Sequence, residues 1–359
     1  MAIRLLRTRN FRLLRKLELS AGPGLNLIIG ANAAGKTSVL DAIHTAVRGR
    51  SFRSPKHAAL AGPEGPRWQV FLKQEHAEAV ANKVGMHWDH GGTKLRFNGS
   101  DQARVAQVLK AIPLQLLDPN AHRLLEDGPG YRRSFVDWGV FHVEQSFHQH
   151  WKTYQRCHRQ RNQALKTSAN IKLVQAWDED MQQAALEITR MRRQHVAQIQ
   201  AALRAITEQL LGIEDVQCHW RQGWPEGRTY AEYLAQNIEQ HRRMGTTVQG
   251  PHRAELKVEL EEKQTRGRLS RGQQKLLITA MVMAQAQVLS QRTGRQAILL
   301  MDDFGAELSA EYQQRLAKVL IDYRGQIFLT SFELPAALRS APLTMFHVEQ
   351  GELKAEPSR

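Results

Sequence analysis

Cysteine is nearly missing from this sequence of 359 residues. The two cysteines, Cys157 and Cys218, are far apart and form no Cys-x-x-Cys pair, which argues against a disulfide scaffold and against a cysteine zinc site. No apolar run approaches the roughly 18–20 residues that a membrane-spanning helix needs. The opening Met-Ala-Ile-Arg lacks the features of a signal peptide. These absences predict a cytoplasmic protein.

Several catalytic patterns are also absent. The sequence has no His-Glu-x-x-His motif, no nucleophile elbow and no nuclease-type cluster of carboxylates. Histidines gather at His142, His148, His150 and His158. A spacing of two residues does not place two imidazoles on one helix face, so packed or solvated histidines are expected rather than a metal site. No recognition helix or aromatic-rich oligonucleotide platform is evident, and sequence-specific reading of nucleic acid is not expected.

Charge of one sign predominates. The chain has 50 Lys and Arg against 35 Asp and Glu, giving a formal net charge of +15. Hydrophobic residues make up 42% and charged residues 24%, which is typical of a soluble globular protein. The basic excess makes a polyanion the leading class of partner.

The apolar pattern predicts an α/β domain interrupted by a helical arm. Strands are expected at 3–6, 17–19, 25–29, 297–303 and 326–332, with a meander of strands at 67–98. Between about 131 and 212, glycine and proline nearly vanish and apolar residues recur at spacings of three and four. That spacing predicts an antiparallel, coiled-coil-like arm. We therefore expect a head formed by residues 1–130 and 245–359, and an inserted arm at 131–244.

The exposed face of this arm is expected to be basic. Its Lys and Arg residues outnumber the acidic ones; they are Lys152, Arg156, Arg159, Arg161, Lys166, Lys172, Arg190, Arg192 and Arg193. Ordinary solvated helix faces also bear such charges, so the pattern alone leaves a role in nucleic-acid binding open.

The strongest motif is a glycine-rich loop between a predicted strand and a predicted helix. It comprises Gly30, Ala31, Asn32, Ala33, Ala34, Gly35, Lys36 and Thr37, followed by Ser38. The loop fits the phosphate-binding pattern GxxxxGK[ST], in which backbone N–H groups and the helix N-terminus surround phosphate oxygens. Lys36 is expected to reach the β- and γ-phosphates of ATP and to assist catalysis, and Thr37 to bind Mg²⁺.

Two further segments suit an ATPase. An apolar strand ends in Asp302 and Asp303. Asp302 is expected to hold Mg²⁺, and Asp303 to orient or deprotonate the attacking water. About 30 residues earlier, Ser270, Gly272 and Gln273 belong to a Ser-Arg-Gly-Gln segment that precedes a helical run. Ser270 is expected to cap that helix and to face a γ-phosphate.

In this order, the three motifs resemble those of the SMC-like branch of ABC-type ATPases, and the chain as a whole resembles the RecF family of bacterial recombination mediators. Further matching segments are Asn10-Phe11-Arg12, Gly49-Arg50-Ser51-Phe52-Arg53, Tyr131-Arg132-Arg133-Ser134-Phe135-Val136-Asp137-Trp138 and Gly250-Pro251-His252-Arg253. The resemblance implies a P-loop ABC-type ATPase head with an inserted helical arm. ATP and Mg²⁺ are the implied cofactors.

The resemblance also implies how such a protein works. Arg53 is then a candidate phosphate contact, and Gln115 the candidate for the Q-loop. The implied activity is slow, DNA-stimulated ATP hydrolysis that controls an ATP-dependent homodimer in which Ser270 completes the partner's site. The implied partners are double-stranded and gapped DNA, RecR and RecO, in recombinational repair at the nucleoid.

Three departures from the ABC pattern qualify this expectation. Asp303 replaces the usual Glu and is one methylene shorter, so slow hydrolysis is expected. Ser309 ends a segment that differs from the usual D-loop, and Thr330 and Ser331 occupy the place of a switch histidine. The alternatives are a transporter ATPase subunit, a head with a nuclease partner, and a nucleotide-dependent scaffold that does not hydrolyse ATP. A nuclease-associated head would have longer coiled coils and a Cys-x-x-Cys hook.

Overall fold

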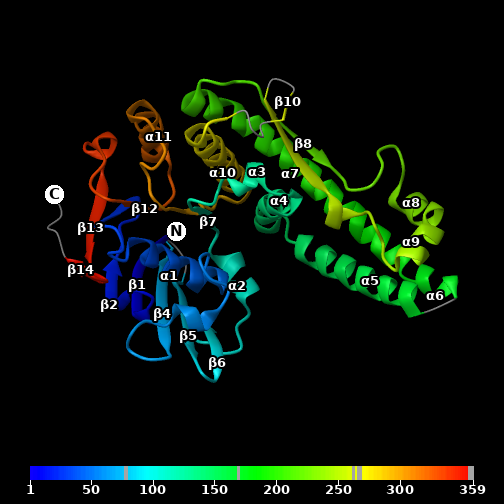
Figure 1. Cartoon of the computed structure of the whole chain (residues 1–359), viewed down its shortest axis with the longest axis horizontal. Coiled ribbons are helices and arrows are strands. Elements are labelled where there is room, and N and C mark those ends of the chain that lie inside the picture. The colour runs from blue at the N-terminus through cyan, green and yellow to red at the C-terminus, as the bar shows by residue number, and fades with distance from the viewer. Residues whose placement is uncertain (77–79, 168–169, 261–262, 265–268, 355–359) are drawn as a thin grey trace.

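A computed structural model describes residues 1–76, 80–167, 170–260, 263–264 and 269–354. Figure 1 shows a head, which contains the first and the last strands, and an arm that extends from it. The expected combination of an α/β head with a helical arm is present. None of the described helices is long and apolar enough to cross a bilayer.

The centre of the head is a six-stranded sheet assembled from distant parts of the sequence. Its order is β14-β13-β3-β12-β11-β7. The bounds are β3 Leu25–Ile29, β7 Leu114–Leu117, β11 Ile298–Met301, β12 Ile327–Ser331, β13 Leu343–Glu349 and β14 Glu352–Lys354. All neighbours are parallel except β13 and β14. The carboxyl ends of β3 and β11, which precede the glycine-rich loop and the Asp302–Asp303 pair, therefore meet at one edge of the sheet.

Both faces of this sheet are covered, as a mainly parallel sheet requires. Ile28 and Leu300 pack with α1 (Lys36–Arg48) on one face. Leu27 and Leu299 pack on the other face with α10 (Arg271–Thr293) and α11 (Ala310–Asp322). Adjacent residues of one strand thus serve two different cores, which explains the nearly continuous apolar runs in the sequence.

A second, five-stranded antiparallel sheet covers the other side of α1. Its order is β2-β1-β4-β5-β6. The bounds are β1 Ala2–Phe11, β2 Leu14–Ser20, β4 Trp68–Glu75, β5 Asn82–Asp89 and β6 Gly92–Phe97, which confirms the predicted meander. Leu6, Trp68 and Val84 are buried on the face toward α1. The opposite face presents polar side chains to solvent, as alternation along half-buried strands predicts.

The arm consists mainly of two long helices. The helices from the head outward and back are α4 Pro129–Val143, α5 Phe147–Thr167, α6 Ile171–Gln175, α7 Asp178–Leu211, α8 Tyr230–Gln236 and α9 Ile238–Met244. Figure 1 shows α5 and α7 side by side along the arm. The predicted apolar stripes of α7, including Met181, Ile188, Val196 and Leu203, are buried. The expected break between α5 and α6 lies partly outside the described residues, at 168–169.

A three-stranded sheet was not expected from the sequence. Its order is β10-β9-β8, with β8 Val216–Arg221, β9 Glu255–Leu260 and β10 Lys263–Gln264. β8 comes from the range predicted as arm, and β9 from the range predicted as head. The sheet therefore joins residues from both sides of the boundary predicted at residue 244, and the division into head and arm at that residue stays a prediction. The remaining elements are α2 Val105–Ala111, α3 Arg123–Glu126, η1 His57–Leu60, η2 Pro251–Arg253 and η3 Ala336–Leu338.

Arg161, predicted on the exposed basic face of the arm, is buried instead. Its side chain is 0% exposed; Nε donates to Asp178 at 2.6 Å and Nη1 donates to Thr247 at 2.8 Å. The guanidinium therefore ties α5 to α7 and to the chain that returns from the arm. Helical spacing does not distinguish such a paired, buried arginine from a solvated one.

Arg192 is the second buried arginine that the sequence placed on the basic face. Its Nε and Nη2 donate to Asp137 at 2.7 and 2.8 Å, and Nη1 donates to the carbonyl of Pro251 at 2.8 Å. The guanidinium also lies over the rings of Trp151 and Trp220. One side chain on α7 thereby joins α4, α5, β8 and the segment before β9.

Replacing Arg192 tests how much this junction contributes to the free energy of unfolding. Arg192→Met is expected to lower the free energy of unfolding by about 3 kcal/mol, because it leaves the Asp137 carboxylate without its partner. Arg193→Met is the matched control: that side chain is half exposed and its loss costs less than about 1 kcal/mol. Urea unfolding followed by circular dichroism measures both, and equal losses would contradict the assignment.

Candidate nucleotide-binding site

The glycine-rich loop joins β3 to α1 at the carboxyl edge of the six-stranded sheet. Its backbone needs glycine: Gly30 and Gly35 have φ of 154° and 115°. A Cβ on Gly30 would lie 2.3 Å from the carbonyl oxygen of Val348 on β13. The predicted strand–loop–helix context of the phosphate-binding motif is therefore present.

The Lys36 side chain folds back over this loop. Its Nζ donates to the carbonyls of Gly30 and Ala31 at 2.7 and 2.8 Å. Partial burial lowers the pKa of Lys36, and the nearby carboxylates of Asp303 and Asp302 oppose that effect. The ammonium is thus held at the centre of the loop, beside both acidic residues predicted from the strand end.

Asp302 is brought together with Thr37, although 265 residues separate them. The Thr37 hydroxyl lies 3.0 and 3.1 Å from the two carboxylate oxygens, and Thr330 donates to one of them at 2.7 Å. A hydroxyl and a carboxylate at this distance are the oxygen ligands that Mg²⁺ prefers beside phosphates. The described residues contain no cluster of three or more His, Cys, Asp or Glu that could hold a metal alone.

Asp303 has a fixed backbone and an open side chain. Its φ is 58°; its N–H donates to the Thr330 hydroxyl at 2.8 Å, and its carbonyl accepts from Lys275 at 2.6 Å. The carboxylate is exposed and makes no hydrogen bond or ion pair with any described residue. It is therefore available to a water molecule or a ligand.

Ser270 caps α10, as predicted. The Ser270 hydroxyl accepts from the N–H of Gln273 at 3.3 Å, and the Gln273 side chain accepts from the N–H of Ser270 at 3.0 Å. Gly272 allows close packing, since a Cβ there would lie 2.5 Å from the carbonyl oxygen of Glu307. Lys275, one turn later, reaches the carbonyl of Asp303. The helix that begins at Ser270 is thus fixed against the segment that follows Asp303.

Gln115 does not lie where a Q-loop residue was expected. It is within β7, is buried, and donates to Gln285 on α10 at 2.5 Å. Side chains alternate along a strand, and Gln115 points into the core beside α10 rather than toward the edge with the glycine loop. The position after β7 is occupied by Asp118. Burial raises the pKa of Asp118, as does nearby Asp302, and a hydrogen bond from Asn120 opposes the rise.

Asp118 and Asn120 lie at this edge of the sheet, within the segment 115–120 in which the Q-loop was expected, and the sequence reasoning chose neither of them. They follow β7, which is parallel to β11, and the N–H of Asp302, directly after β11, donates to the carbonyl of Leu117 at the end of β7. Carboxyl ends of adjacent parallel strands converge on the same edge. Residues 114–117 were not among the strands predicted from the sequence, so the rule about carboxyl ends could not be applied to the residues that follow them.

Arg53 is exposed and its side chain contacts no described residue through a hydrogen bond or ion pair. The preceding residues are anchored to α1: Ser51 donates to Asp41 at 2.8 Å, and the N–H of Phe52 donates to the same carboxylate at 3.1 Å. Arg12 donates to Asp41 and to Ser51 as well. A role for Arg53 at the phosphates stays a prediction.

The comparison with known proteins agrees with this geometry. A model of the RecF/RecN/SMC N terminal domain matches residues 2–353. A DNA replication and repair protein RecF from Vibrio vulnificus (strain CMCP6) is 34% identical over 349 residues, which cover 96% of this chain and 97% of that protein. The chain belongs to the RecF family. The RecF protein of Shewanella amazonensis (strain ATCC BAA-1098 / SB2B) is 35% identical over 347 residues, which cover 96% of this chain and 96% of that protein.

Solved structures support the same fold. A structure described as the recombination mediator protein RecF-ATP in the RecFOR pathway has a TM-score of 0.85 at 20% identity and covers 98% of this chain and 97% of that one. An Smc head domain from Pyrococcus furiosus has a TM-score of 0.60 at 15% identity, and the match covers 98% of this chain and 95% of that one. The predicted SMC-like ABC head with a helical insertion is confirmed.

Two of the further segments through which the sequence resembles the RecF family, 131–138 and 250–253, hold the arm to the head. Arg133 donates to the carbonyl of Ala254 at 2.8 Å, and Arg132 forms an ion pair with Glu255 at 2.7 Å. Asp137, from the same segment, binds Arg192. These two segments therefore form the base of the arm, whereas 10–12 and 49–53 pack on α1 in the head.

Proposed function

We propose that this RecF family member is an ATP-gated DNA-binding protein with a slow, DNA-stimulated ATPase activity that acts in recombinational repair at gapped DNA and at duplex–single-strand junctions. The observation that supports it best is the meeting of Thr37 with Asp302 beside Lys36. A similar solved structure is described as RecF-ATP in the RecFOR pathway.

The site suits hydrolysis of a bound triphosphate. Lys36 would neutralise charge on the β- and γ-phosphates, while Thr37 and Asp302 would hold Mg²⁺, which supplies further positive charge there. Asp303 would orient a water molecule and accept its proton. The water oxygen bonds to the γ-phosphorus as the bond to the β–γ bridging oxygen breaks, which releases ADP and phosphate.

ATP is proposed to join two copies of the chain. Ser270 is exposed at the tip of α10, and among the described residues no hydrogen bond or ion pair connects it with the glycine-rich loop of the same chain. A second copy placed with two-fold symmetry would supply Ser270 to the triphosphate on the first. ATP then stabilises the dimer because it binds both subunits, and hydrolysis releases it.

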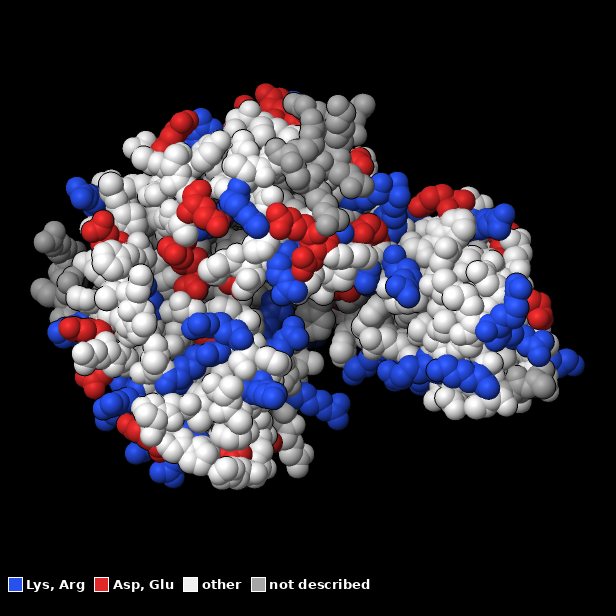
Figure 2. All heavy atoms as spheres, viewed as in Figure 1, with Lys and Arg blue, Asp and Glu red and all other residues white. Residues whose placement is uncertain are grey.

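The arm offers a face for the phosphate backbone of duplex DNA. Lys152, Arg156, Arg159 and Lys166 are exposed on α5 at spacings of four, three and seven, which places them on one side of the helix. Figure 2 shows Lys and Arg along the edge of the arm in this region and in the hollow between arm and head. Such a stripe suits backbone contacts without sequence reading.

The hollow at the base of the arm continues this basic surface. It has a volume of about 830 Å³, and Arg104, Lys110, Lys152, Arg292 and Arg295 line it. None of its described lining residues is Asp or Glu; Glu144 forms an ion pair with Arg292 nearby. This accumulation of cations supports the proposed DNA contact. RecR and RecO are proposed as partners from family membership alone.

Charge reversal on α5 tests the DNA contact. Lys152→Glu combined with Arg159→Glu is expected to weaken binding of a 30-bp duplex at least tenfold. The dependence of log affinity on log salt concentration should become shallower by about 1.8, or about 0.9 per lost phosphate contact. Lys318→Glu with Arg324→Glu, two exposed residues in and just after α11, is the control of equal charge. Equal losses in both variants would contradict a local contact.

The alternatives predict different outcomes in one assay. A nucleotide-dependent scaffold would bind ATP and DNA without releasing phosphate, whereas the proposed ATPase releases phosphate slowly and faster with duplex DNA. A transporter ATPase subunit would show no stimulation by DNA. Phosphate release with and without gapped duplex therefore separates the three functions.

A further inference from the structure

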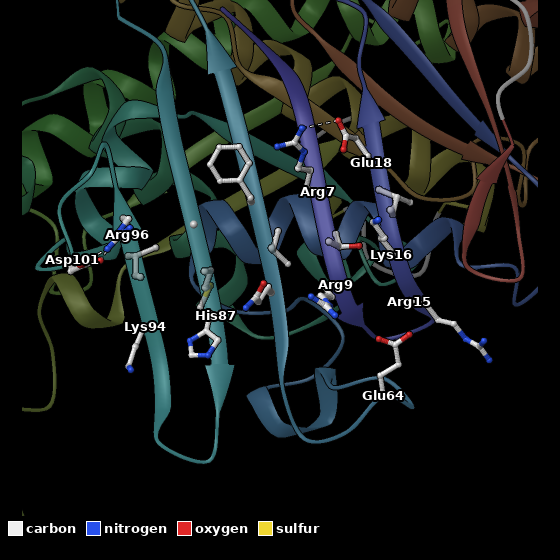
Figure 3. A pocket seen from close by; sticks show the side chains of 18 residues that line it. Arg7, Arg9, Arg15, Lys16, Glu18, Glu64, His87, Lys94, Arg96 and Asp101 are labelled. Carbon is white, nitrogen blue, oxygen red and sulfur yellow. Dashed lines mark hydrogen bonds and ion pairs between the residues drawn. The ribbon is translucent and has the colours of Figure 1, made fainter.

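The open face of the five-stranded sheet forms a groove of about 770 Å³ that the nucleotide site does not use. Figure 3 shows it from close by, with side chains from β1, β2, β4, β5 and β6. Six of its lining residues are Lys or Arg and three are carboxylates: Arg7, Arg9, Arg15, Lys16, Lys94, Arg96, Glu18, Glu64 and Asp101. The face is thus basic, and it belongs to the head rather than to the arm.

One row of this face crosses all five strands without a carboxylate. The strand register places Lys16, Arg9, Gln69, His87 and Lys94 directly opposite one another in turn. Two of the neighbouring pairs combine basic side chains, Lys16 with Arg9 and His87 with Lys94. Like charges directly opposite each other destabilise a sheet, so folding alone gives no reason for this row.

Two acidic residues of the groove, Glu18 and Asp101, form their ion pairs with arginines outside the row, although their charges also act on Lys16 and Lys94. Arg7 binds Glu18 at 2.9 Å and Arg96 binds Asp101 at 2.6 Å, one row away, as the dashed lines in Figure 3 indicate. His87 contacts Asp89 on its own strand at 3.0 Å. Arg9, Lys16 and Lys94 are exposed and form no hydrogen bond or ion pair with the described residues through their side chains. Three cations therefore remain available to an anion.

The second row presents an aromatic ring beside a glycine. Phe71 on β4 lies directly opposite Gly85 on β5. The φ of Gly85 is not in the left-handed region, and a Cβ there would meet nothing closer than Arg96 Cβ at 3.9 Å. Neither backbone strain nor packing thus requires glycine. Its effect is to leave no side chain directly opposite Phe71, and a glycine inside a strand often marks the close approach of a ligand.

We propose that this face binds single-stranded nucleic acid, with phosphates along the cationic row and a base stacked on Phe71. Four inter-strand steps of about 4.8 Å give the row a length of about 19 Å, enough for a short run of phosphates. Single strands expose base faces for stacking on aromatic rings, whereas a duplex hides them. An acidic peptide is the weaker fit, because Leu17, Val70 and Met86 are buried and offer no pocket for apolar anchors.

This proposal adds a single-strand site on the head to the duplex contact proposed for the arm. It does not depend on the proposed ATP-dependent dimer. The first test combines Lys16→Glu with Lys94→Glu and measures fluorescence anisotropy of a labelled 20-mer of thymidylate and of a 20-bp duplex. Single-strand affinity is expected to fall at least tenfold, with a salt slope shallower by about 1.4, or about 0.7 per contact. Duplex affinity is expected to stay within twofold.

The same control as for the arm, Lys318→Glu with Arg324→Glu, should leave both probes within twofold. Thermal unfolding of each variant confirms that it is folded. The proposal is overturned if the sheet variant and the control lose single-strand affinity equally, because the effect would then be long-range electrostatics. It is also overturned if the sheet variant loses binding of a labelled poly-glutamate peptide that the thymidylate 20-mer does not displace.

A second variant separates stacking from charge. Phe71→Leu keeps an apolar side chain and removes the ring, so binding of the thymidylate 20-mer should weaken at least fivefold. Binding of an abasic 20-mer, which retains the phosphates, should be unchanged in Phe71→Leu and weakened in Lys16→Glu with Lys94→Glu. Equal affinity of Phe71→Leu and the unmodified protein for thymidylate would overturn the stacking contact.

Discussion

Ser270→Arg is expected to abolish the ATP-dependent dimer and to leave ATP binding within about twofold of the unmodified protein. The side chain is exposed at the N-terminus of α10, and its hydroxyl takes part in a capping box with Gln273. In the proposed dimer this hydroxyl and the N–H groups behind it face the triphosphate of the other copy. An arginine there adds bulk at the contact and removes the cap, while Lys36, Thr37 and Asp302 of the same chain are untouched.

Sedimentation velocity with ATP, with ADP and without nucleotide measures the dimer, and a fluorescent ATP analogue measures binding. Thr229→Arg is the matched control, because Thr229 caps α8 in the arm with the same kind of capping box. Both substitutions cost about 1 kcal/mol of helix capping, so any difference in dimerisation comes from the position. A Ser270→Arg protein that still dimerises with ATP would refute the shared site.

The parts of the site that could be predicted from the sequence are those fixed by local chemistry. The loop from Gly30 to Thr37 forms where it does because glycine is needed at its strained backbone positions. Thr37 and Asp302 were both expected at Mg²⁺ from their motifs, and they meet because both follow strands of one parallel sheet, whose carboxyl ends share an edge. Neither inference required knowledge of distant packing.

The parts that failed depended on partners elsewhere in the chain. Gln115 was the Q-loop candidate that the resemblance implied, but the alternation of β7 turns it toward Gln285. Arg161 and Arg192 have the spacing of a solvated helix face and are nevertheless buried against Asp178 and Asp137. Whether a polar side chain is exposed depends on what packs over it, and periodicity within one helix does not contain that information.

The backbone at Asp303 explains a departure from the ABC pattern. Its φ of 58° lies in the left-handed region, which Asp and Asn adopt far more readily than Glu. The structure fixes this conformation from both sides, through Thr330 and Lys275. An aspartate thus suits the turn better than the glutamate usual in related ATPases, and we infer that hydrolysis is slow as a consequence of the shorter carboxylate.

Asp303→Asn is expected to lower the rate of phosphate release by about 10²–10⁴-fold while ATP binding and the ATP-dependent dimer persist. Asparagine tolerates the same left-handed backbone, so the substitution removes the proton acceptor and leaves the turn intact. Phosphate release under single-turnover conditions measures the rate, and sedimentation in ATP measures the dimer. Asp322→Asn, in the last turn of α11 and far from the loop, is the control.

Asp303→Glu separates the effect of the carboxylate's length on hydrolysis from the effect of the backbone conformation on stability. A longer carboxylate would reach the water better, but glutamate disfavours a positive φ, so a faster rate would have to appear together with a lower melting temperature. If Asp303→Asn hydrolyses ATP at the unmodified rate, Asp303 is not the proton acceptor. Asp118, the half-buried carboxylate beside Asp302, would then be the residue to substitute, because its raised pKa makes the ionised carboxylate a stronger proton acceptor.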